Sequence, residues 1–122
     1  MPWTYSQSTG QLRQNGALVG TGYSGAGQNA ANGRNNPAMQ GIANQGPIPT
    51  GQYLIGNSYN HPQKGPTSMN LTPLGHNALG RTGFMIHGNN VQDNASQGCI
   101  ILGPTIRQQI AASNDHVLTV QP

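Results

Sequence analysis

The sequence predicts a mainly β fold, a sandwich or a barrel, in one domain that spans residues 1–122. Three observations support this prediction. The chain has 122 residues, too few for two ordinary domains. Gly, Pro, Asn and Gln supply 54 residues (18, 9, 14 and 13), so turn formers divide the chain into short apolar runs. No long run of Ala, Glu, Lys and Leu at helical period is present, which excludes a helical bundle.

The first 50 residues predict two or three strands and a long loop. Trp3, Tyr5 and Gln7 share one strand parity, and we expect the two aromatic rings to pack in the core. Asn15-Gly16 is the dipeptide typical of a tight hairpin, so a further strand is expected from Ala17. Residues 25–46 lack apolar periodicity and predict a surface loop.

The rest of the chain predicts four or five strands and one helix. Strands are expected at 52–55, at 68–71 with Pro73 closing the strand, at 83–88, in the apolar run 98–103, and at 117–120. Pro104 stands where the first turn of a helix would begin, and Ile106 and Ile110 share one helical face. A short helix to about Ala112 therefore follows the cysteine run.

Charge and hydropathy exclude several classes of function. The net charge of +3 comes from five scattered basic residues and two aspartates, without the basic stripe that nucleic-acid binding requires. The longest apolar run is Cys99–Leu102, far below the roughly 20 residues of a membrane span. We expect no membrane span, no nucleic-acid partner and, because His61, His76 and His116 lack a ligand spacing, no metal or other cofactor.

His87 and Cys99 are the residues that predict chemistry. A histidine at a strand end and the only cysteine, twelve residues later, form the minimal pair for thiol acyl transfer, in which the imidazole takes the thiol proton. The same imidazole is expected to lower the pKa of the thiol. The N–H groups of Gly98 and Cys99 are candidates for an oxyanion hole, and Ser96 is a candidate to orient His87 by its hydroxyl or its carbonyl. The residues alone leave open that Cys99 is structural and His87 caps a loop.

The order of these residues resembles a known family. His87-Gly88, a short loop and Ser96-x-Gly98-Cys99-Ile100 resemble the active-site signature of the YkuD-like L,D-transpeptidases. Further fragments resemble the subfamily of L,D-transpeptidase-like effectors of type VI secretion: Trp3-x-Tyr5, Gly22-Tyr23-Ser24-Gly25, Gly46-Pro47-Ile48-Pro49-x-Gly51-x-Tyr53, Gly65-Pro66 and Gly80-Arg81-x-Gly83-Phe84-x-Ile86-His87-Gly88.

This resemblance implies an antibacterial enzyme that acts on the peptide stems of peptidoglycan. It implies Cys99 as the nucleophile on the carbonyl of an L-centred residue, typically diaminopimelate, His87 as base and then acid, Gly98 as oxyanion donor and Ser96 as the orienting group. Water would resolve the acyl-enzyme in an L,D-carboxypeptidase, and an amine would resolve it in an L,D-transpeptidase. The alternative is a module of the same fold that binds peptidoglycan without turnover.

The substrate-binding residues are less directly implied. Many family members have a His where this chain has Gln97, and an Arg or Asn near the position of Ile101. We therefore expect Arg81 to replace that group as the anchor for a stem carboxylate. Tyr23, Ser24, Gly88 and Gln97 are expected to wall the cleft.

Partners and location also follow from the resemblance. It implies a monomer that meets a peptidoglycan stem peptide, a cognate immunity protein and a component of the secretion machinery. The first residues have no basic and apolar segment of the Sec type. We expect a chain that is made in the cytoplasm, exported by another route and active in the periplasm of target bacteria.

Overall fold

The computed structural model describes residues 3–122, and the ten strands of this part form one sheet. Their order is β3-β2-β1-β10-β5-β7-β8-β9-β4, with β6 paired to β7 outside that path. The bounds are β1 Trp3–Ser6, β2 Gln11–Gln14, β3 Ala17–Thr21, β4 Tyr23–Ser24, β5 Gly51–Ile55, β6 Tyr59–His61, β7 Gly65–Leu74, β8 Met85–His87, β9 Ile100–Ile101 and β10 Val117–Gln121. The predicted mainly β fold is confirmed.

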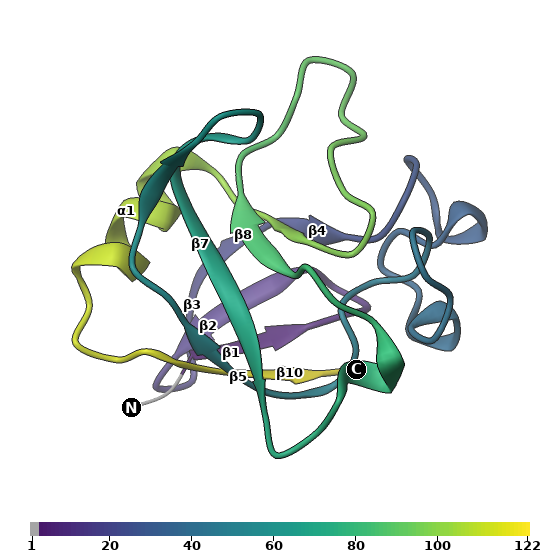
Figure 1. The fold of residues 1–122 in the computed structure, drawn as a ribbon, viewed down its shortest axis with the longest axis horizontal. Helices are drawn as coiled ribbons and strands as arrows, with labels where there is room; N and C mark the ends of the chain where they lie inside the picture. The colour runs from purple at the N-terminus through teal and green to yellow at the C-terminus, as the bar shows by residue number, and fades with distance from the viewer. Residues whose placement is uncertain (1–2) are drawn as a thin grey trace.

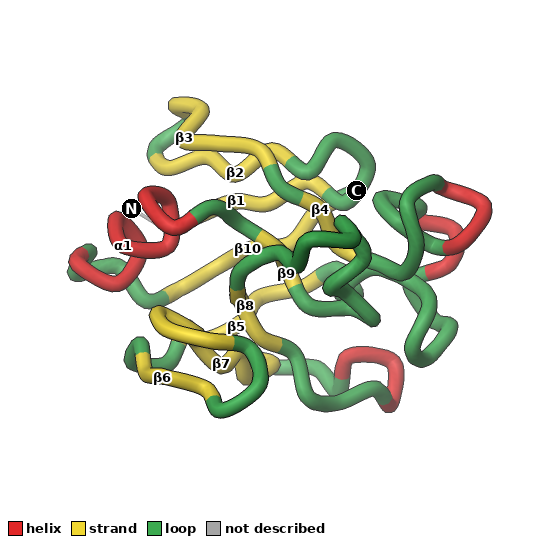
Figure 2. The backbone as a smooth tube through the Cα atoms, turned by 90° about the horizontal axis from the view of Figure 1, so that it is seen from above, coloured by secondary structure: helices red, strands yellow, loops and turns green. Residues whose placement is uncertain are grey.

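The sheet folds over on itself around one core (Figures 1 and 2). Strands β3 and β4 lie at opposite ends of the strand order, yet only Gly22 separates them in the chain. A Cβ on Gly22 would lie 1.8 Å from the carbonyl oxygen of Ile101, so no side chain fits at this crossing. The Gly22 N–H donates to the carbonyl of Gly10 at 2.8 Å, which fixes the crossing.

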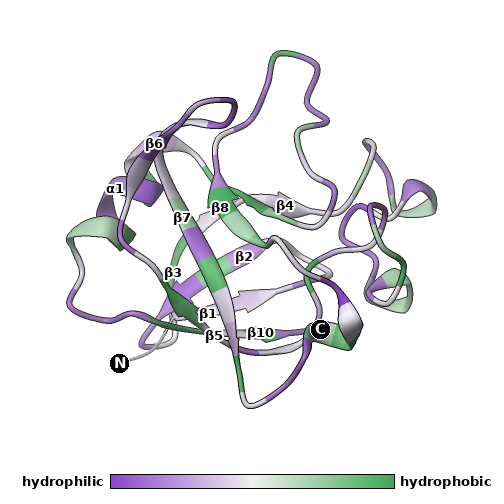
Figure 3. Ribbon diagram, in the orientation of Figure 1, coloured by the Kyte–Doolittle hydropathy of each residue, from purple (hydrophilic) through white to green (hydrophobic). Residues whose placement is uncertain are grey.

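Both halves of the sheet contribute to the core. Trp3, Tyr5 and Leu12 from β1 and β2 belong to the same buried cluster as Met69 and Ile86 from β7 and β8. Trp3 and Tyr5 are 1% and 0% exposed, as the strand parity predicted. In the middle of β7, Met69 and Leu71 are buried and Asn70 and Thr72 are exposed, the pattern of a strand with one buried face (Figure 3).

One α-helix, α1 (Pro104–Ala112), follows β9 as predicted. Pro104 occupies the first turn, where its missing N–H costs nothing. Ile110 is buried and Ile106 packs against the core. Arg107 is also buried, and its Nε donates to the Leu102 carbonyl at 2.9 Å. Three single 3₁₀ turns complete the helical structure of the described chain: η1 Ala30–Asn32, η2 Pro37–Met39 and η3 Ala78–Gly80.

Of two predicted turns and strand ends, the structure confirms one and corrects the other. The Asn15-Gly16 hairpin is confirmed, since both residues have positive φ (54° and 79°) between β2 and β3. The prediction that Pro73 ends its strand is wrong, because β7 continues to Leu74 with Pro73 opposite Tyr53. The strand tolerates proline here because β8 pairs only with Met69 and Asn70, so β7 has no second partner at Pro73.

Candidate active site

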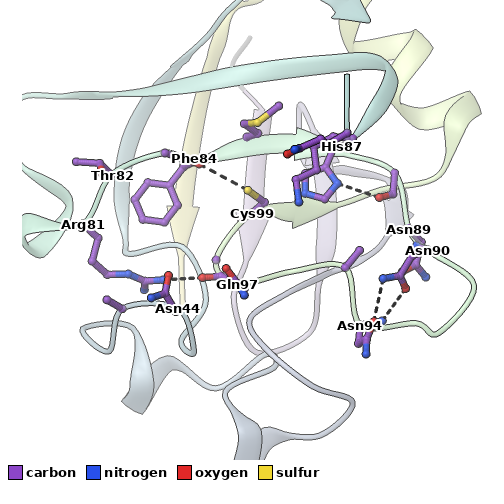
Figure 4. Close-up of a pocket in the computed structure, with 18 of the residues that line it drawn as sticks. Asn44, Arg81, Thr82, Phe84, His87, Asn89, Asn90, Asn94, Gln97 and Cys99 are labelled. Carbon is purple, nitrogen blue, oxygen red and sulfur yellow. Dashed lines mark hydrogen bonds between the residues drawn. The ribbon is translucent and has the colours of Figure 1, made fainter. Parts of the chain in front are cut away.

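A cavity of about 650 Å³ opens beside the end of strand β8, and both His87 and Cys99 line it (Figure 4). Its walls come from four segments of the chain. The lining residues are Ala43, Asn44, Gln63, Lys64, Gly80, Arg81, Thr82, Gly83, Phe84, Met85, His87, Gly88, Asn89, Asn90, Asn94, Ala95, Gln97, Gly98 and Cys99.

Strand pairing brings the histidine and the cysteine together. Strands β8 and β9 are parallel neighbours, with Ile86 opposite Ile100 and His87 opposite Ile101. The chain leaves β8 at His87, makes the loop 88–98 and returns to the same sheet beside β8. Two residues twelve positions apart therefore share one cavity, as the sequence predicted.

The ring nitrogens of His87 have different surroundings. Nδ1 lies 2.9 Å from the carbonyl oxygen of Gly88, which can only accept, so Nδ1 carries the proton. Nε2 is then the nitrogen with the lone pair, and it is buried without a hydrogen-bond partner in the described chain. Burial lowers the pKa of His87, with smaller contributions from the positive charges of Lys64 and Arg107. His87 is a neutral base in the tautomer that acid–base catalysis at Nε2 requires.

The Cys99 thiol is partly buried beside this base. Its Sγ donates to the carbonyl oxygen of Gly83 at 3.7 Å, and burial raises the pKa of the thiol. The hydrogen bond from the Met85 N–H and the charges of Lys64 and Arg81 oppose this increase without cancelling it. The prediction that the thiol pKa is lowered is therefore wrong for the resting state, in which thiol and imidazole are both neutral.

Ser96 organises the loop before the cysteine. Its hydroxyl donates to the Cys99 carbonyl at 2.6 Å and accepts from the N–H groups of Gly25 (2.9 Å) and Gly98 (3.0 Å). It makes no hydrogen bond to His87, whose Nδ1 bonds the Gly88 carbonyl instead. The expected orienting contact is thus made by Gly88, and Ser96 fixes the backbone at the N–H of Gly98 and at the carbonyl of Cys99.

Gly98 is held at both of its peptide groups. Its N–H donates to Ser96, and its carbonyl accepts from the hydroxyl of Ser24 at 2.9 Å. Its φ of 137° and the 2.5 Å that would separate a Cβ from Nη2 of Arg81 require glycine. Because the Gly98 N–H is occupied, the Cys99 N–H, which has no acceptor among the described residues, is the donor left for an oxyanion.

Arg81 lies in the cavity wall, but its guanidinium is engaged. Nη1 donates to the carbonyls of Gln40 (2.6 Å) and Pro47 (2.8 Å), and Nη2 donates to those of Gly46 and Gln97 (both 3.1 Å). These contacts use all four Nη hydrogens. Arg81 therefore connects the loop 40–47 to the loop that precedes Cys99, and its Nη groups have no hydrogen left to donate to a substrate carboxylate.

The other expected wall residues divide into two groups. Gly88 and Gln97 line the cavity. Tyr23 and Ser24 lie behind it: the Tyr23 hydroxyl bonds Asn89 (2.6 Å) and the Ala95 N–H (2.9 Å), and the Ser24 hydroxyl, in addition to its bond to Gly98, accepts from the Ile48 N–H (2.9 Å). Tyr23 and Ser24 therefore support the loop 88–98 without lining the space beside the thiol.

Two residues that line the cavity, Gln63 and Lys64 in the β6–β7 hairpin, were not predicted from the sequence. Pro62 and Gly65 flank these residues and are the turn signal that could have located them. No group of three or more potential ligands within residues 3–122 is arranged to hold a metal ion. None of the helices in this range is long and apolar enough to cross a bilayer.

A comparison of the sequence with models of known protein families identifies the family of this chain. The model of the Tlde1 domain matches residues 19–121, nearly the whole chain. The chain belongs to the Tlde1 domain family. This membership makes it a type VI secretion effector, an antibacterial toxin of the kind that is exported by secretion machinery and paired with a cognate immunity protein. No curated protein matches the chain.

Proposed function

We propose that this Tlde1 domain is a peptidoglycan L,D-transpeptidase or L,D-carboxypeptidase with Cys99 as its nucleophile. The observation that carries the proposal is the state of His87, whose Nδ1–H is held by Gly88 while Nε2 lies unpartnered in the cavity of Cys99. Histidine in this tautomer beside a thiol is the arrangement that nucleophilic acyl transfer needs.

The first half-reaction releases a D-amino acid. The thiol rotates from the Gly83 carbonyl toward Nε2, and Sγ attacks the carbonyl carbon of the L-centre while its proton passes to His87. The Cys99 N–H stabilises the oxyanion that develops on the carbonyl oxygen. The C–N bond then breaks, and the proton on Nε2 passes to the leaving amine, so the products are a thioester and a free D-amino acid.

The second half-reaction restores the enzyme. Water or the amine of another molecule loses a proton to Nε2 and attacks the thioester carbonyl. The C–S bond breaks, and Nε2 returns the proton to Sγ. Water gives the shortened stem, and an amine gives exchange or a crosslink.

A tetrapeptide assay tests this proposal. Purified disaccharide tetrapeptides from peptidoglycan are incubated with the chain, with and without an added D-amino acid, and the products are identified by mass. We expect loss of the terminal D-Ala, or its replacement by the added amino acid. Cys99→Ala and His87→Gln should each lower the rate at least about a thousandfold.

Val91→Ala is the matched control, because Val91 is 96% exposed on the same loop and does not line the cavity. It should keep the rate of the unmodified chain. Activity of Cys99→Ala close to that of the control would contradict the nucleophile assignment. Binding of the tetrapeptide with no product from the unmodified chain would instead support the non-catalytic binding module.

A further inference from the structure

Lys64 differs from Arg81, the other positively charged residue of the cavity, because its ammonium group makes no hydrogen bond or ion pair with the described residues. Among the described residues that line the space around Cys99, Arg81 and Lys64 are the two with a positive charge, since the lowered pKa of His87 keeps its ring neutral. Both Nη groups of Arg81 donate to backbone carbonyls, whereas no hydrogen bond or ion pair of residues 3–122 involves the Lys64 ammonium. The cavity therefore has one cation that can pair with a ligand.

The backbone under Lys64 is held in place. Within the turn of the β6–β7 hairpin, the N–H groups of Gln63 and Lys64 donate to Nδ1 of His61 at 3.0 and 3.1 Å. At the base of the hairpin, Nη1 of Arg107 donates to the Pro66 carbonyl at 2.7 Å, which ties the hairpin to helix α1. The exposed ammonium thus extends from a fixed turn.

The charge balance of the cavity favours an anionic ligand. No acidic side chain is among the residues that line it, and the polar lining consists largely of the amides of asparagine and glutamine. Asp93, in the loop 88–98, does not itself line the cavity and is paired with Arg34 at 3.2 Å. The charge of Lys64 also reaches His87 and Cys99: it adds to the lowering of the His87 pKa by burial and opposes the raising of the Cys99 pKa by burial. A carboxylate bound within a residue's length of the thiol would therefore lie in the field of Lys64.

We propose that Lys64 determines substrate specificity by pairing with the terminal carboxylate of the amino acid that leaves. This inference rests on the proposed function, in which the leaving D-amino acid places its carboxylate one residue beyond the scissile carbonyl. The chain would then favour stems that end in a free acid directly after the bond it breaks, and would discriminate against stems that are amidated or extended there.

Binding measurements test Lys64 apart from turnover. Two synthetic stem tetrapeptides, identical except for a terminal acid or a terminal amide, are titrated calorimetrically into the Cys99→Ser chain, which keeps the size of the side chain. Adding Lys64→Gln should weaken binding of the acid about tenfold and leave binding of the amide within about twofold. Lys64→Arg should keep most of the preference for the acid.

Two controls separate pairing from general charge. Arg13→Gln removes the same charge from the β2–β3 hairpin, outside the cavity, and should leave the preference for the acid unchanged. Raising the salt concentration should reduce the preference in the chain with Lys64 and have little effect in Lys64→Gln, since an exposed ion pair is screened.

The outcomes distinguish this inference from the proposed function. Equal losses for acid and amide would overturn the inference and assign Lys64 to another carboxylate of the peptide, such as that of diaminopimelate. Unchanged binding of both peptides would overturn it as well. A preference for the acid that depends on Lys64, together with no product from the unmodified chain, would uphold the inference and refute the enzyme. Binding of neither peptide by a folded chain would refute both.

Discussion

Burial shifts the pKa values of His87 and Cys99 in opposite directions. It lowers the pKa of His87 and raises that of Cys99, so it disfavours the charged form of each. Both side chains are therefore neutral in the free chain, and under the proposed function proton transfer accompanies the attack on the substrate. Since only the thiolate reacts readily with oxidants and alkylating agents, we expect the thiol of the free chain to react slowly with both.

The pH dependence of the reaction should report the lowered pKa of His87. The acid limb of kcat/KM is expected to have its midpoint below 6.5, the ordinary value for histidine, because the neutral base persists to lower pH and is lost only when the pH falls through its lowered pKa. Initial rates between pH 4 and pH 8 measure it. A midpoint at or above 6.5 would show that burial does not lower the pKa of His87 in the free chain.

Ser96→Ala should reduce stability without moving that acid limb. The substitution leaves the N–H groups of Gly25 and Gly98 and the Cys99 carbonyl without their partner in a buried place, at a cost of about 2 kcal/mol or more. We expect a lower midpoint in urea and a lower kcat, because the backbone of the nucleophile loosens. A shift in the acid limb would instead return Ser96 to the role of orienting His87.

That His87 and Cys99 share a cavity could be predicted from the sequence, but the contacts that support them could not. His87 and Cys99 are marked by residue type and by a strand end, both local features. The partners of Ser96 include Gly25, 71 residues away, and those of Arg81 lie up to 41 residues away. Such contacts depend on how loops from different strands meet, which no local pattern specifies.

At the scale of elements, loops of different origin are joined around the site by buried polar side chains. Arg81 binds carbonyls of two loops, Tyr23 spans the loop 88–98 between Asn89 and Ala95, and the Arg34 guanidinium lies 3.4 Å from the centre of the Tyr23 ring. The long segment 25–46, predicted as a surface loop, contains no strand and is joined to the site by these contacts of Arg81 and Arg34. Because Arg81 binds carbonyls in this segment and also the carbonyl of Gln97, a displacement of the segment would also displace the loop that precedes Cys99.

Arg81→Lys provides the test of this arrangement. A lysine cannot reproduce four hydrogen bonds from a planar group, so we expect a loss of about 3 kcal/mol in the free energy of unfolding, measured in urea. Arg13→Lys on the partly exposed β2–β3 hairpin is the matched control and should change stability by less than about 0.5 kcal/mol. If Arg81 anchored the substrate instead, KM would rise while the urea midpoint stayed constant.

Elements with strong local signals were the predictable ones. The Asn15-Gly16 hairpin, the strand at 85–87 and helix α1 each have a turn residue or an apolar pattern that suffices. Strand β6 was missed because Tyr59–His61 is short and largely exposed and pairs only with β7. The end of β7 was also predicted wrongly, because a strand accepts a proline only where it lacks a neighbouring strand on one side, and the sequence does not show where β8 ends.

At the scale of the whole molecule, the site lies on a small domain that needs no disulfide, since Cys99 is free and is the only cysteine. Such a domain can fold in a reducing or an oxidising compartment. Under the proposed function, only the compartment that holds peptidoglycan exposes a target.

Expression of the chain in a Gram-negative host should therefore be tolerated in the cytoplasm and should stop growth when a secretion signal directs the chain to the periplasm. Growth curves and microscopy measure this, with swollen or misdivided cells expected in the second case. Cys99→Ala is the control and should be harmless in both compartments. Toxicity in the cytoplasm equal to that in the periplasm, or a folded periplasmic chain without effect, would argue against a cell-wall target.

The position of β10 in the sheet determines when the domain can complete its folding. Strand β10 pairs on one side with β1 and on the other with β5, so residues 117–121 join the two halves of the sheet. A ribosome that has not yet released these residues holds a chain whose β1 and β5 edges have no partner and whose core cannot close. Because this pairing joins residues more than a hundred positions apart, it belongs to the slow class of folding steps. The domain thus becomes competent only after residues 117–121 have joined β1 to β5, in one step that involves both halves of the sheet.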